Sequence, residues 1–316
     1  MFWFLFLLLA AVLLIAVSGI YVFIVACLRR KELPWLIKEE IEKTPYGKYY
    51  NQIAEAEMWL RGHNAQDWYI TGEDCLRLHG IWVPAENPKA TVIMVHGYRS
   101  TYLLDFGKAM EIYHSMGYNL LLPDQRSHGK SEGQYITFGV KESRDIYKWI
   151  EYHNVHCGNT PVVLSGLSMG ASTVLYLADK ELPSNVRCIV ADCGFTSPRE
   201  ILSSVFKRVT HLPATASLWF TELLARAFAG FSLTQEDTRR SLKHSKLPVF
   251  MVHGTDDNFV PCEMTKQASA LCSGKMQVLY VEGAEHGVSF LTEPETYKTR
   301  LLAFLNEHVG VPEINK

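Results

Sequence analysis

The distribution of apolar residues divides the chain into a tail and a larger domain. From Phe2 to Leu28 no residue is charged, and only Ser18 and Gly19 lie outside the hydrophobic set. A helix of this length would measure about 40 Å, which is enough to cross the roughly 30 Å hydrocarbon core of a bilayer with some tilt. The pattern therefore predicts a transmembrane helix over residues 2–28.

A cleaved signal peptide and a buried core helix are the alternatives for this segment. A signal peptide needs a basic stretch and an apolar core of about 7–15 residues, whereas no Lys or Arg precedes this much longer run. Arg29, Arg30 and Lys31 follow it directly, and basic flanks stay on the cytoplasmic side. We therefore expect a single-pass protein of the cell membrane whose main domain faces the cytoplasm.

Beyond the tail, short apolar runs alternate with amphipathic stretches. Residues 29–70 predict a connector and a packing helix, because Ile53, Ala56 and Leu60 share a helical face. Strands are expected at 75–83, 91–95, 118–124, 161–165, 186–191, 248–252 and 276–281, the first of them antiparallel. Helices are expected at 103–116, 141–152, 171–180, 262–272 and 295–308.

Apolar strands separated by helices indicate a mostly parallel sheet with helices on both faces. We expect this α/β domain to span residues 71–310. Residues 196–246 interrupt the alternation of strands and helices. Their aromatic-rich helical patterns predict a helical lid inserted above the sheet. Ordinary packing helices are the alternative. Ligands of such sheets bind at the carboxyl ends of the strands.

Composition excludes some classes of protein but does not identify the function. The 316 residues are 48% hydrophobic and carry a formal net charge of -2, which excludes a disordered chain and argues against nucleic-acid binding. Seven cysteines lack any Cys-x-x-Cys pair or zinc spacing, so reduced thiols are expected. The chain has no P-loop and no dinucleotide fingerprint, so we expect no metal and no cofactor.

A nucleophile motif gives the strongest indication of chemistry. Gly166-Leu167-Ser168-Met169-Gly170 stands between a predicted strand and a predicted helix. A serine at such a sharp turn exposes its hydroxyl above the sheet, and the glycines permit close backbone approach. A packing turn of small residues is the alternative. We expect Ser168 to be a nucleophile.

A serine nucleophile needs a base that is oriented by an acid. Asp257 follows the strand at 248–252, and His286 follows the strand at 276–281, so both lie at the same sheet edge as Ser168 in the order serine, acid, histidine. Asp256 is the alternative acid and Glu285 a weaker one. His253 is expected to have a structural role.

Backbone N–H groups near Ser168 are candidates for an oxyanion hole. Met169 follows the nucleophile at the helix start, and Tyr98 lies in the loop after the strand at 91–95. His96 would support this loop. The turn-rich stretch 124–133 is expected to be structural, with Asp124 and Arg126 pinning a tight loop, rather than to act through His128.

Together these ordered motifs resemble the α/β-hydrolase fold superfamily over roughly residues 70–310. They are His96-Gly97, Asp124-x-Arg126-x-x-Gly129, Gly166-x-Ser168-x-Gly170, Gly254-x-x-Asp257 and Glu285-His286-Gly287. More narrowly, the chain is similar to bacterial membrane-anchored hydrolases with a serine aminopeptidase-like domain. One departure is Ser127, where that family usually has glycine. The resemblance implies Ser168, Asp257 and His286 as a catalytic triad, with Tyr98 and Met169 as oxyanion donors.

The expected function is hydrolysis of a small-molecule carboxylic ester, or a related acyl bond, at the membrane. An amidase or peptidase and a thioesterase would use the same triad, and the sequence does not separate them. A non-catalytic hydrolase-like binding protein is the alternative from another class, although such proteins usually lose a member of the triad.

Overall fold

Eight strands form one sheet in the computed structural model, which describes residues 1–30 and 38–309. Their order across the sheet is β1-β2-β4-β3-β5-β6-β7-β8. Neighbours are parallel from β4 to β8, whereas β2 is antiparallel to both β1 and β4. The strands are β1 (Gln66–Thr71), β2 (Arg77–Val83), β3 (Ala90–Val95), β4 (Tyr118–Pro123), β5 (Val162–Leu167), β6 (Val186–Asp192), β7 (Val249–Gly254) and β8 (Met276–Val281).

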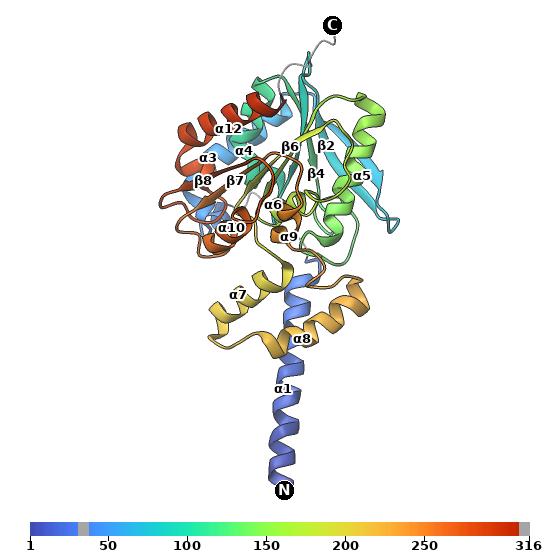
Figure 1. Ribbon diagram of the computed structural model, residues 1–316, viewed down its shortest axis with the longest axis vertical. Coiled ribbons are helices and arrows are strands. Elements are labelled where there is room, and N and C mark those ends of the chain that lie inside the picture. The colour runs from blue at the N-terminus through green and yellow to red at the C-terminus, as the bar shows by residue number, and fades with distance from the viewer. Residues whose placement is uncertain (31–37, 310–316) are drawn as a thin grey trace.

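Helices surround this sheet and extend below it (Figure 1). Before the sheet come α1 (Phe2–Cys27), α2 (Lys38–Ile41), the 3-10 helix η1 (Pro45–Tyr49) and α3 (Tyr50–Arg61). Between strands lie α4 (Tyr102–Ser115), α5 (Val140–Cys157), α6 (Met169–Leu175), α7 (Pro198–Thr210), α8 (Thr215–Leu224), the π-helix η2 (Ala225–Ala229), α9 (Thr238–Lys243) and α10 (Cys262–Ser269). The chain continues into α11 (Ser289–Thr292) and α12 (Pro294–Val309).

The inner strands are apolar on both sides because helices cover both faces of the sheet. Every residue of β3, β4, β5 and β7 is buried. From β3, Val92 and Met94 join a core with α3, α4 and α12, whereas Ile93 and Val95 join the opposite core with α5, α6, α9 and α10. The expected α/β fold with a mostly parallel, doubly covered sheet is therefore confirmed.

Several elements differ from the sequence prediction: α5 ends five residues later than expected, at Cys157, α10 ends three residues earlier, at Ser269, and β1 and α6 also differ. β1 falls in the stretch expected to be a connector, and it pairs antiparallel with β2 at the sheet edge. Of its residues only Ile70 is fully buried, so β1 lacks the apolar run that marks the inner strands. α6 ends at Leu175, five residues before the expected end, and the chain then continues in turns.

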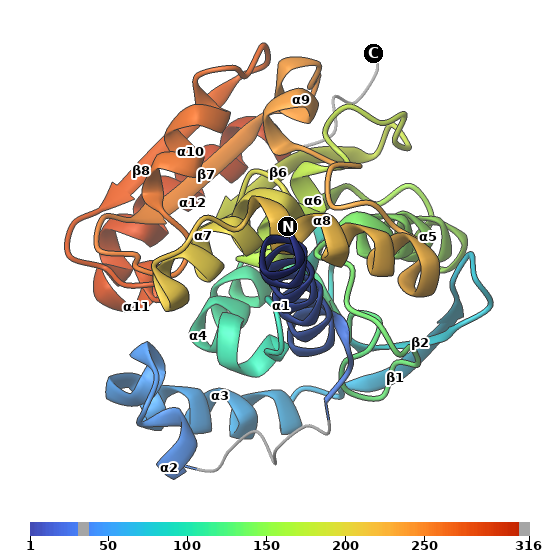
Figure 2. The ribbon, with the colours of Figure 1, turned by 90° about the horizontal axis from the view of Figure 1, so that it is seen from below.

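Residues 196–246, all of which the structure describes, contain α7, α8, η2 and α9 and no strand. Ser197 caps α7 by accepting the N–H of Glu200, and Pro198 occupies the first turn. The π-helix η2 ends at Gly230, whose φ of 66° suits glycine. α7 and α8 lie below the sheet, on opposite sides of α1 (Figures 1 and 2).

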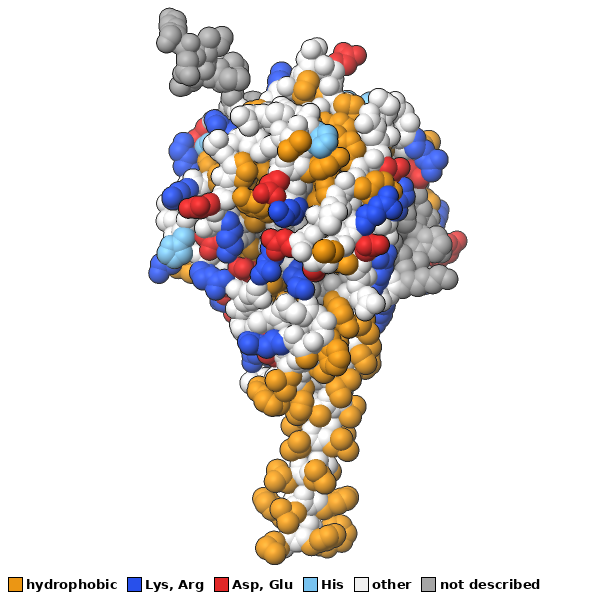
Figure 3. All heavy atoms as spheres, turned by 90° about the vertical axis from the view of Figure 1, so that its right-hand side faces the viewer, with side chains coloured by type: hydrophobic (Ala, Val, Ile, Leu, Met, Phe, Trp, Pro, Cys, Tyr) orange, Lys and Arg blue, Asp and Glu red, His pale blue; other side chains and the backbone are white. Residues whose placement is uncertain are grey.

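α1 projects from the body and is long and apolar enough to cross a membrane (Figures 1 and 3). Its C-terminal half is attached to the domain, with Gly19, Phe23 and Cys27 buried. Just beyond it, the side chain of Arg29 donates hydrogen bonds to the carbonyl oxygens of Ser131 (2.6 Å) and Gly129 (2.8 Å). Residue 31, the last of the basic flank, lies outside the described residues.

Candidate active site

Ser168 occupies a strained turn between β5 and α6. Its φ of 54° and ψ of -115° are unusual for a residue with a side chain. The flanking glycines allow this turn, because a Cβ on Gly166 would lie 2.2 Å from the Gly170 oxygen. A Cβ on Gly170 would lie 1.8 Å from the Val95 oxygen. Only glycine fits at either position, as the motif predicted.

The structure brings Ser168, His286 and Asp257 together in one hydrogen-bonded chain. The Nε2 atom of His286 lies 2.9 Å from the Ser168 hydroxyl oxygen, and its Nδ1 atom lies 2.6 Å from Asp257 Oδ2. Each side chain follows a different strand, β5, β7 or β8, at its carboxyl end. With Nδ1 protonated toward the carboxylate, Nε2 is free to accept the proton of the serine hydroxyl.

Asp257 is buried and held as a carboxylate. Its Oδ1 accepts the N–H groups of Phe259 and Val260, both at 2.8 Å. Burial raises the pKa of Asp257, but hydrogen bonds from His253 and His286 outweigh it and hold that pKa well below its ordinary value. An ionised Asp257 at neutral pH can stabilise positive charge on His286.

The alternative acids contact neither Ser168 nor His286, and His253 supports Asp257 from behind. Asp256 is exposed and contacts the hydroxyl of Thr255. Glu285 is also exposed and lies 4.0 Å from Lys48. His253 is fully buried behind Asp257, with Nε2 3.2 Å from its Oδ2 and Nδ1 2.7 Å from the Thr265 hydroxyl.

The loop after β3 lies against the nucleophile. A Cβ on Gly97 would come within 3.2 Å of Ser168 Cβ. Asp105 of α4 holds this loop by accepting the N–H of Gly97 and the hydroxyl of Ser100, both at 2.5 Å. The hydroxyl of Tyr46, from η1, is a third donor at 3.1 Å. Burial raises the pKa of Asp105 despite these bonds.

Asp105 and Tyr46 were not singled out in the sequence. Asp105 lies inside an amphipathic helix, where a lone carboxylate usually faces solvent, and Tyr46 lies in the stretch read as a connector. No local pattern links either residue to the loop that they hold, since Tyr46 and Asp105 are 59 positions apart.

Tyr98 and Met169 offer two backbone N–H groups beside Ser168. Within residues 1–30 and 38–309, neither N–H donates to another protein group. The N–H of Met169 belongs to the first turn of α6, where helical N–H groups lack partners. Two such donors near a serine hydroxyl are suited to a developing oxyanion.

Histidines behind this loop have structural roles. His96 Nε2 accepts the N–H of Gln125 at 3.1 Å. His128 Nε2 accepts the N–H of Arg99 at 2.9 Å, and its Nδ1 donates to the Arg126 carbonyl at 2.9 Å. Burial lowers the pKa of His128 to about 3, so it is neutral at pH 7.

The loop after β4 is pinned as expected. Arg126 forms a buried pair with Asp145, with Nε 2.7 Å from Oδ2. Asp124 accepts the N–H of Lys130 at 2.9 Å. Ser127 adopts a φ of 64°, which explains why related loops place glycine there, and its hydroxyl donates to the Tyr135 carbonyl at 2.9 Å.

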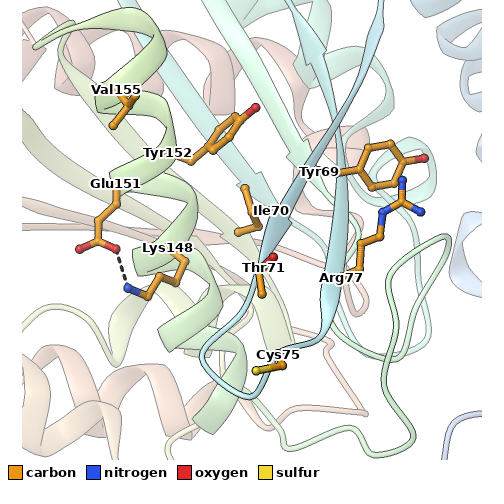
Figure 4. A pocket seen from close by; sticks show the side chains of 9 residues that line it. All are labelled: Tyr69, Ile70, Thr71, Cys75, Arg77, Lys148, Glu151, Tyr152 and Val155. Atoms are coloured by element: carbon orange, nitrogen blue, oxygen red, sulfur yellow. Dashed lines mark hydrogen bonds and ion pairs between the residues drawn. The ribbon is translucent and has the colours of Figure 1, made fainter.

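A cavity of about 270 Å³ opens beside Ser168 and His286. Its lining includes the apolar side chains of Leu104, Leu167 and Phe259. The Phe259 ring lies 5.0 Å from the His286 ring, centroid to centroid. A larger hollow of about 580 Å³ lies between the β1–β2 hairpin and α5 (Figure 4), but β2, β4 and β3 separate its edge strand from β5.

One group near the site has metal-ligating atoms. Cys193, Asp257 and His286 place one such atom each within 4.8 Å of one another. Burial raises the pKa of Cys193 well above its ordinary value, so the thiol is protonated and a poor ligand. The Asp257 and His286 atoms are already hydrogen-bonded to each other. This arrangement suits proton transfer better than metal binding.

The eight-stranded sheet and a serine raised on the turn after its fifth strand define an α/β hydrolase. Residues 90–247, half of the chain, match the family described as alpha/beta hydrolase fold. The chain therefore belongs to the α/β hydrolase fold family, and it is a hydrolase of that superfamily.

Similar proteins include an esterase, a lipase and a protein that is itself uncharacterized. The esterase Pf2001 of Pyrococcus furiosus superposes with a TM-score of 0.63 and 25% identity, covering 79% of this chain and 94% of that one. The uncharacterized protein YqkD of Bacillus subtilis is 24% identical over 230 residues, which are 72% of this chain and 75% of YqkD. The lysophosphatidylserine lipase ABHD12 of Macaca fascicularis is 23% identical over 224 residues, 68% of this chain and 51% of ABHD12.

Proposed function

We propose that this protein is a membrane-anchored serine hydrolase that cleaves a carboxylic ester. The observation that carries the proposal is the hydrogen-bonded chain from the Ser168 hydroxyl through His286 to Asp257. Similarity to an esterase supports the choice of an ester over other acyl bonds.

Catalysis then follows from the roles of these groups. His286 removes the hydroxyl proton as Ser168 Oγ attacks the acyl carbonyl carbon, and Asp257 stabilises the resulting imidazolium. The N–H groups of Tyr98 and Met169 hold the oxyanion. Collapse of the tetrahedral intermediate breaks the ester bond, and the imidazolium gives its proton to the departing alcohol. Water activated by His286 then attacks the acyl-enzyme and releases the acid.

The cavity also bears on the choice between an ester and an aminoacyl substrate. Asp105 is the single lining residue with a carboxyl group. Its oxygens already accept hydrogen bonds from Gly97, Ser100 and Tyr46. No lining carboxylate is left to bind the amine of an aminoacyl substrate. Amidase, peptidase and thioesterase activities share the triad and are distinguished by turnover of matched ester, thioester and aminoacyl-amide substrates.

The membrane anchor is the second part of the proposal. α1 would span the bilayer once, and the basic residues that follow it would keep the domain on the cytoplasmic side. Extraction at alkaline pH tests the anchor, because a spanning helix stays with the membrane whereas a peripheral protein is released.

The catalytic assignment is tested with Ser168→Ala. We expect hydrolysis of p-nitrophenyl esters to fall by several orders of magnitude and fluorophosphonate labelling to disappear. Ser184→Ala, which changes an exposed serine away from the triad, is the matched control and should behave as the unmodified protein. Unchanged labelling and turnover in Ser168→Ala would show that Ser168 is not the nucleophile. A folded, unmodified protein that is never labelled would instead favour a binding protein.

A further inference from the structure

The insertion between β6 and β7 exposes large apolar side chains close together in the chain. Outside residues 1–27 and this insertion, the large apolar residues that the structure shows as exposed are scattered singly: Met58, Val155, Leu271 and Tyr280. Those of the insertion, here called the apolar lid face, are Val209 (72% exposed), Leu212 (60%), Trp219 (57%), Leu223 (45%) and Phe228 (62%). Such a concentration on α7, α8, η2 and the turn between α7 and α8 marks an interaction surface.

The apolar lid face is fixed to α1. A Cβ on Gly19 would lie 2.5 Å from both Phe220 Cβ and the Ser217 oxygen, so the two helices are in close backbone contact. The Thr221 hydroxyl donates to the Gly19 carbonyl at 3.0 Å. The hydroxyls of Ser217 and Ser18 lie 3.1 Å apart. The position of α8 along α1 is therefore set by small and hydroxyl side chains.

This position coincides with the edge of a membrane that α1 would span. The part of α1 before Gly19 is about 25 Å long, close to the roughly 30 Å thickness of the hydrocarbon core. Figures 1 and 2 show α8 crossing α1 and α7 lying to one side of it, both inclined to the axis of α1 rather than parallel to it. If α1 spans the bilayer, both helices lie along its surface.

The composition around the apolar lid face suits the lipid headgroup region. Lys207 and Arg208 are exposed in the last turn of α7, and Arg29 and Arg30 follow α1. Basic side chains next to exposed Trp and Phe are typical of helices that lie in the membrane interface. Apolar side chains continue from α1 onto the adjoining underside of the body (Figure 3).

The same insertion contacts the pocket beside Ser168. The guanidinium of Arg208 lies 5.2 Å from the centroid of the Phe259 ring and donates to the Asn258 carbonyl. Phe259 lines the cavity and packs beside His286. α7 therefore contributes Val209 to the apolar lid face and, through Arg208, contacts a residue of the pocket.

We propose that the apolar lid face rests in the interface of the bilayer that α1 spans, and that the pocket receives acyl esters of amphiphiles from that leaflet. This inference rests on the proposed anchor and hydrolase activity. The bilayer is the partner, because the surface continues from the spanning helix and lies at its membrane boundary.

Bromolipid quenching of tryptophan fluorescence tests where α8 lies. The full chain is reconstituted in phosphatidylcholine vesicles with and without brominated lipid, and the spectra of Trp219→Phe and Trp3→Phe are each subtracted from that of the unmodified protein. We expect the emission of both Trp219 and Trp3 to be quenched. Quenching of Trp3 alone would overturn the inference while leaving the anchor intact. Quenching of neither would overturn the anchor and the inference together.

Activity provides the second test. In the same vesicles, Trp219→Ser combined with Leu212→Ser should lower turnover of an embedded long-chain acyl ester about tenfold while leaving turnover of soluble p-nitrophenyl acetate unchanged. Val155→Ser, on an exposed apolar residue of α5, is the matched control and should change neither rate. An equal loss on both substrates, or no loss on the embedded ester, would contradict the proposed contact.

Discussion

His128, which is buried behind the loop beside Ser168, makes the stability of the folded protein depend on pH. Burial lowers its pKa from 6.5 to about 3, so between these values the unfolded chain binds a proton that the folded protein does not. Stability therefore rises with pH through this window and is lost as pH falls. Between pH 7 and pH 5 this difference lowers the free energy of unfolding by about 2 kcal/mol, because each pKa unit corresponds to about 1.36 kcal/mol.

We expect His128→Gln to reduce the loss of stability between pH 7 and pH 5. The measurement is the urea unfolding midpoint in detergent at the two pH values. His211→Gln, which replaces an exposed histidine, is the control and should keep the full decline. The same pH dependence in His128→Gln and the unmodified protein would show that another group causes it.

Some residues of the candidate site could be predicted from the sequence, and others could not. Ser168, Asp257 and His286 each follow an apolar strand, and parallel strands place their carboxyl ends at one edge of the sheet. Their proximity thus follows from order along the chain. Asp105 and Tyr46 could not be found in this way, because their contact depends on how η1 packs over α4.

At the scale of elements, α1 and the loop after β3 are directly bonded. The Arg99 guanidinium donates to the carbonyls of Val25 (2.7 Å) and Leu28 (3.0 Å), which the end of a helix leaves unpaired. The Tyr98 hydroxyl donates to the Ala26 carbonyl at 3.0 Å, and burial raises its pKa to about 12, so it stays protonated. The proposed anchor thus helps to position the proposed oxyanion donor.

We expect Arg99→Ala to lower kcat about tenfold with little change in KM, because the loop loses the two hydrogen bonds from Arg99 to α1 and keeps only that of Tyr98. Arg99→Lys should restore part of the rate. Steady-state kinetics on a soluble ester measure both parameters, with Arg187→Ala on an exposed position of β6 as control. An unchanged kcat in Arg99→Ala would show that the loop holds its geometry without α1.

The elements were predictable where burial imposes a pattern. The inner strands are buried at every position and mostly apolar, because helices cover both of their faces. β1 was missed because it borders the sheet, with only Ile70 buried and Gln66, Asp67 and Thr71 exposed. This edge strand forms because it pairs with β2, and that pairing leaves no recognisable pattern in the sequence of β1 itself.

At the scale of the whole molecule, the proposed orientation places the turn between β1 and β2 in the cytoplasm. Cys75 on this turn is an exposed thiol. We expect a membrane-impermeant maleimide to label Cys75 only after cells expressing the full chain are permeabilised. Cys75→Ser identifies the labelled site by subtraction. Labelling in intact cells would reverse the orientation.

Tyr46 links the segment after α1 to the pocket, and this affects how a soluble form of the enzyme should be made. Its hydroxyl bonds to Asp105, and a Cβ on Gly287, next to His286, would come within 2.3 Å of that oxygen. Together with Thr44 and Pro45 it forms one wall of the cavity. A truncation at the start of the sheet would remove this wall along with the anchor. A chain that begins at residue 38 would keep it.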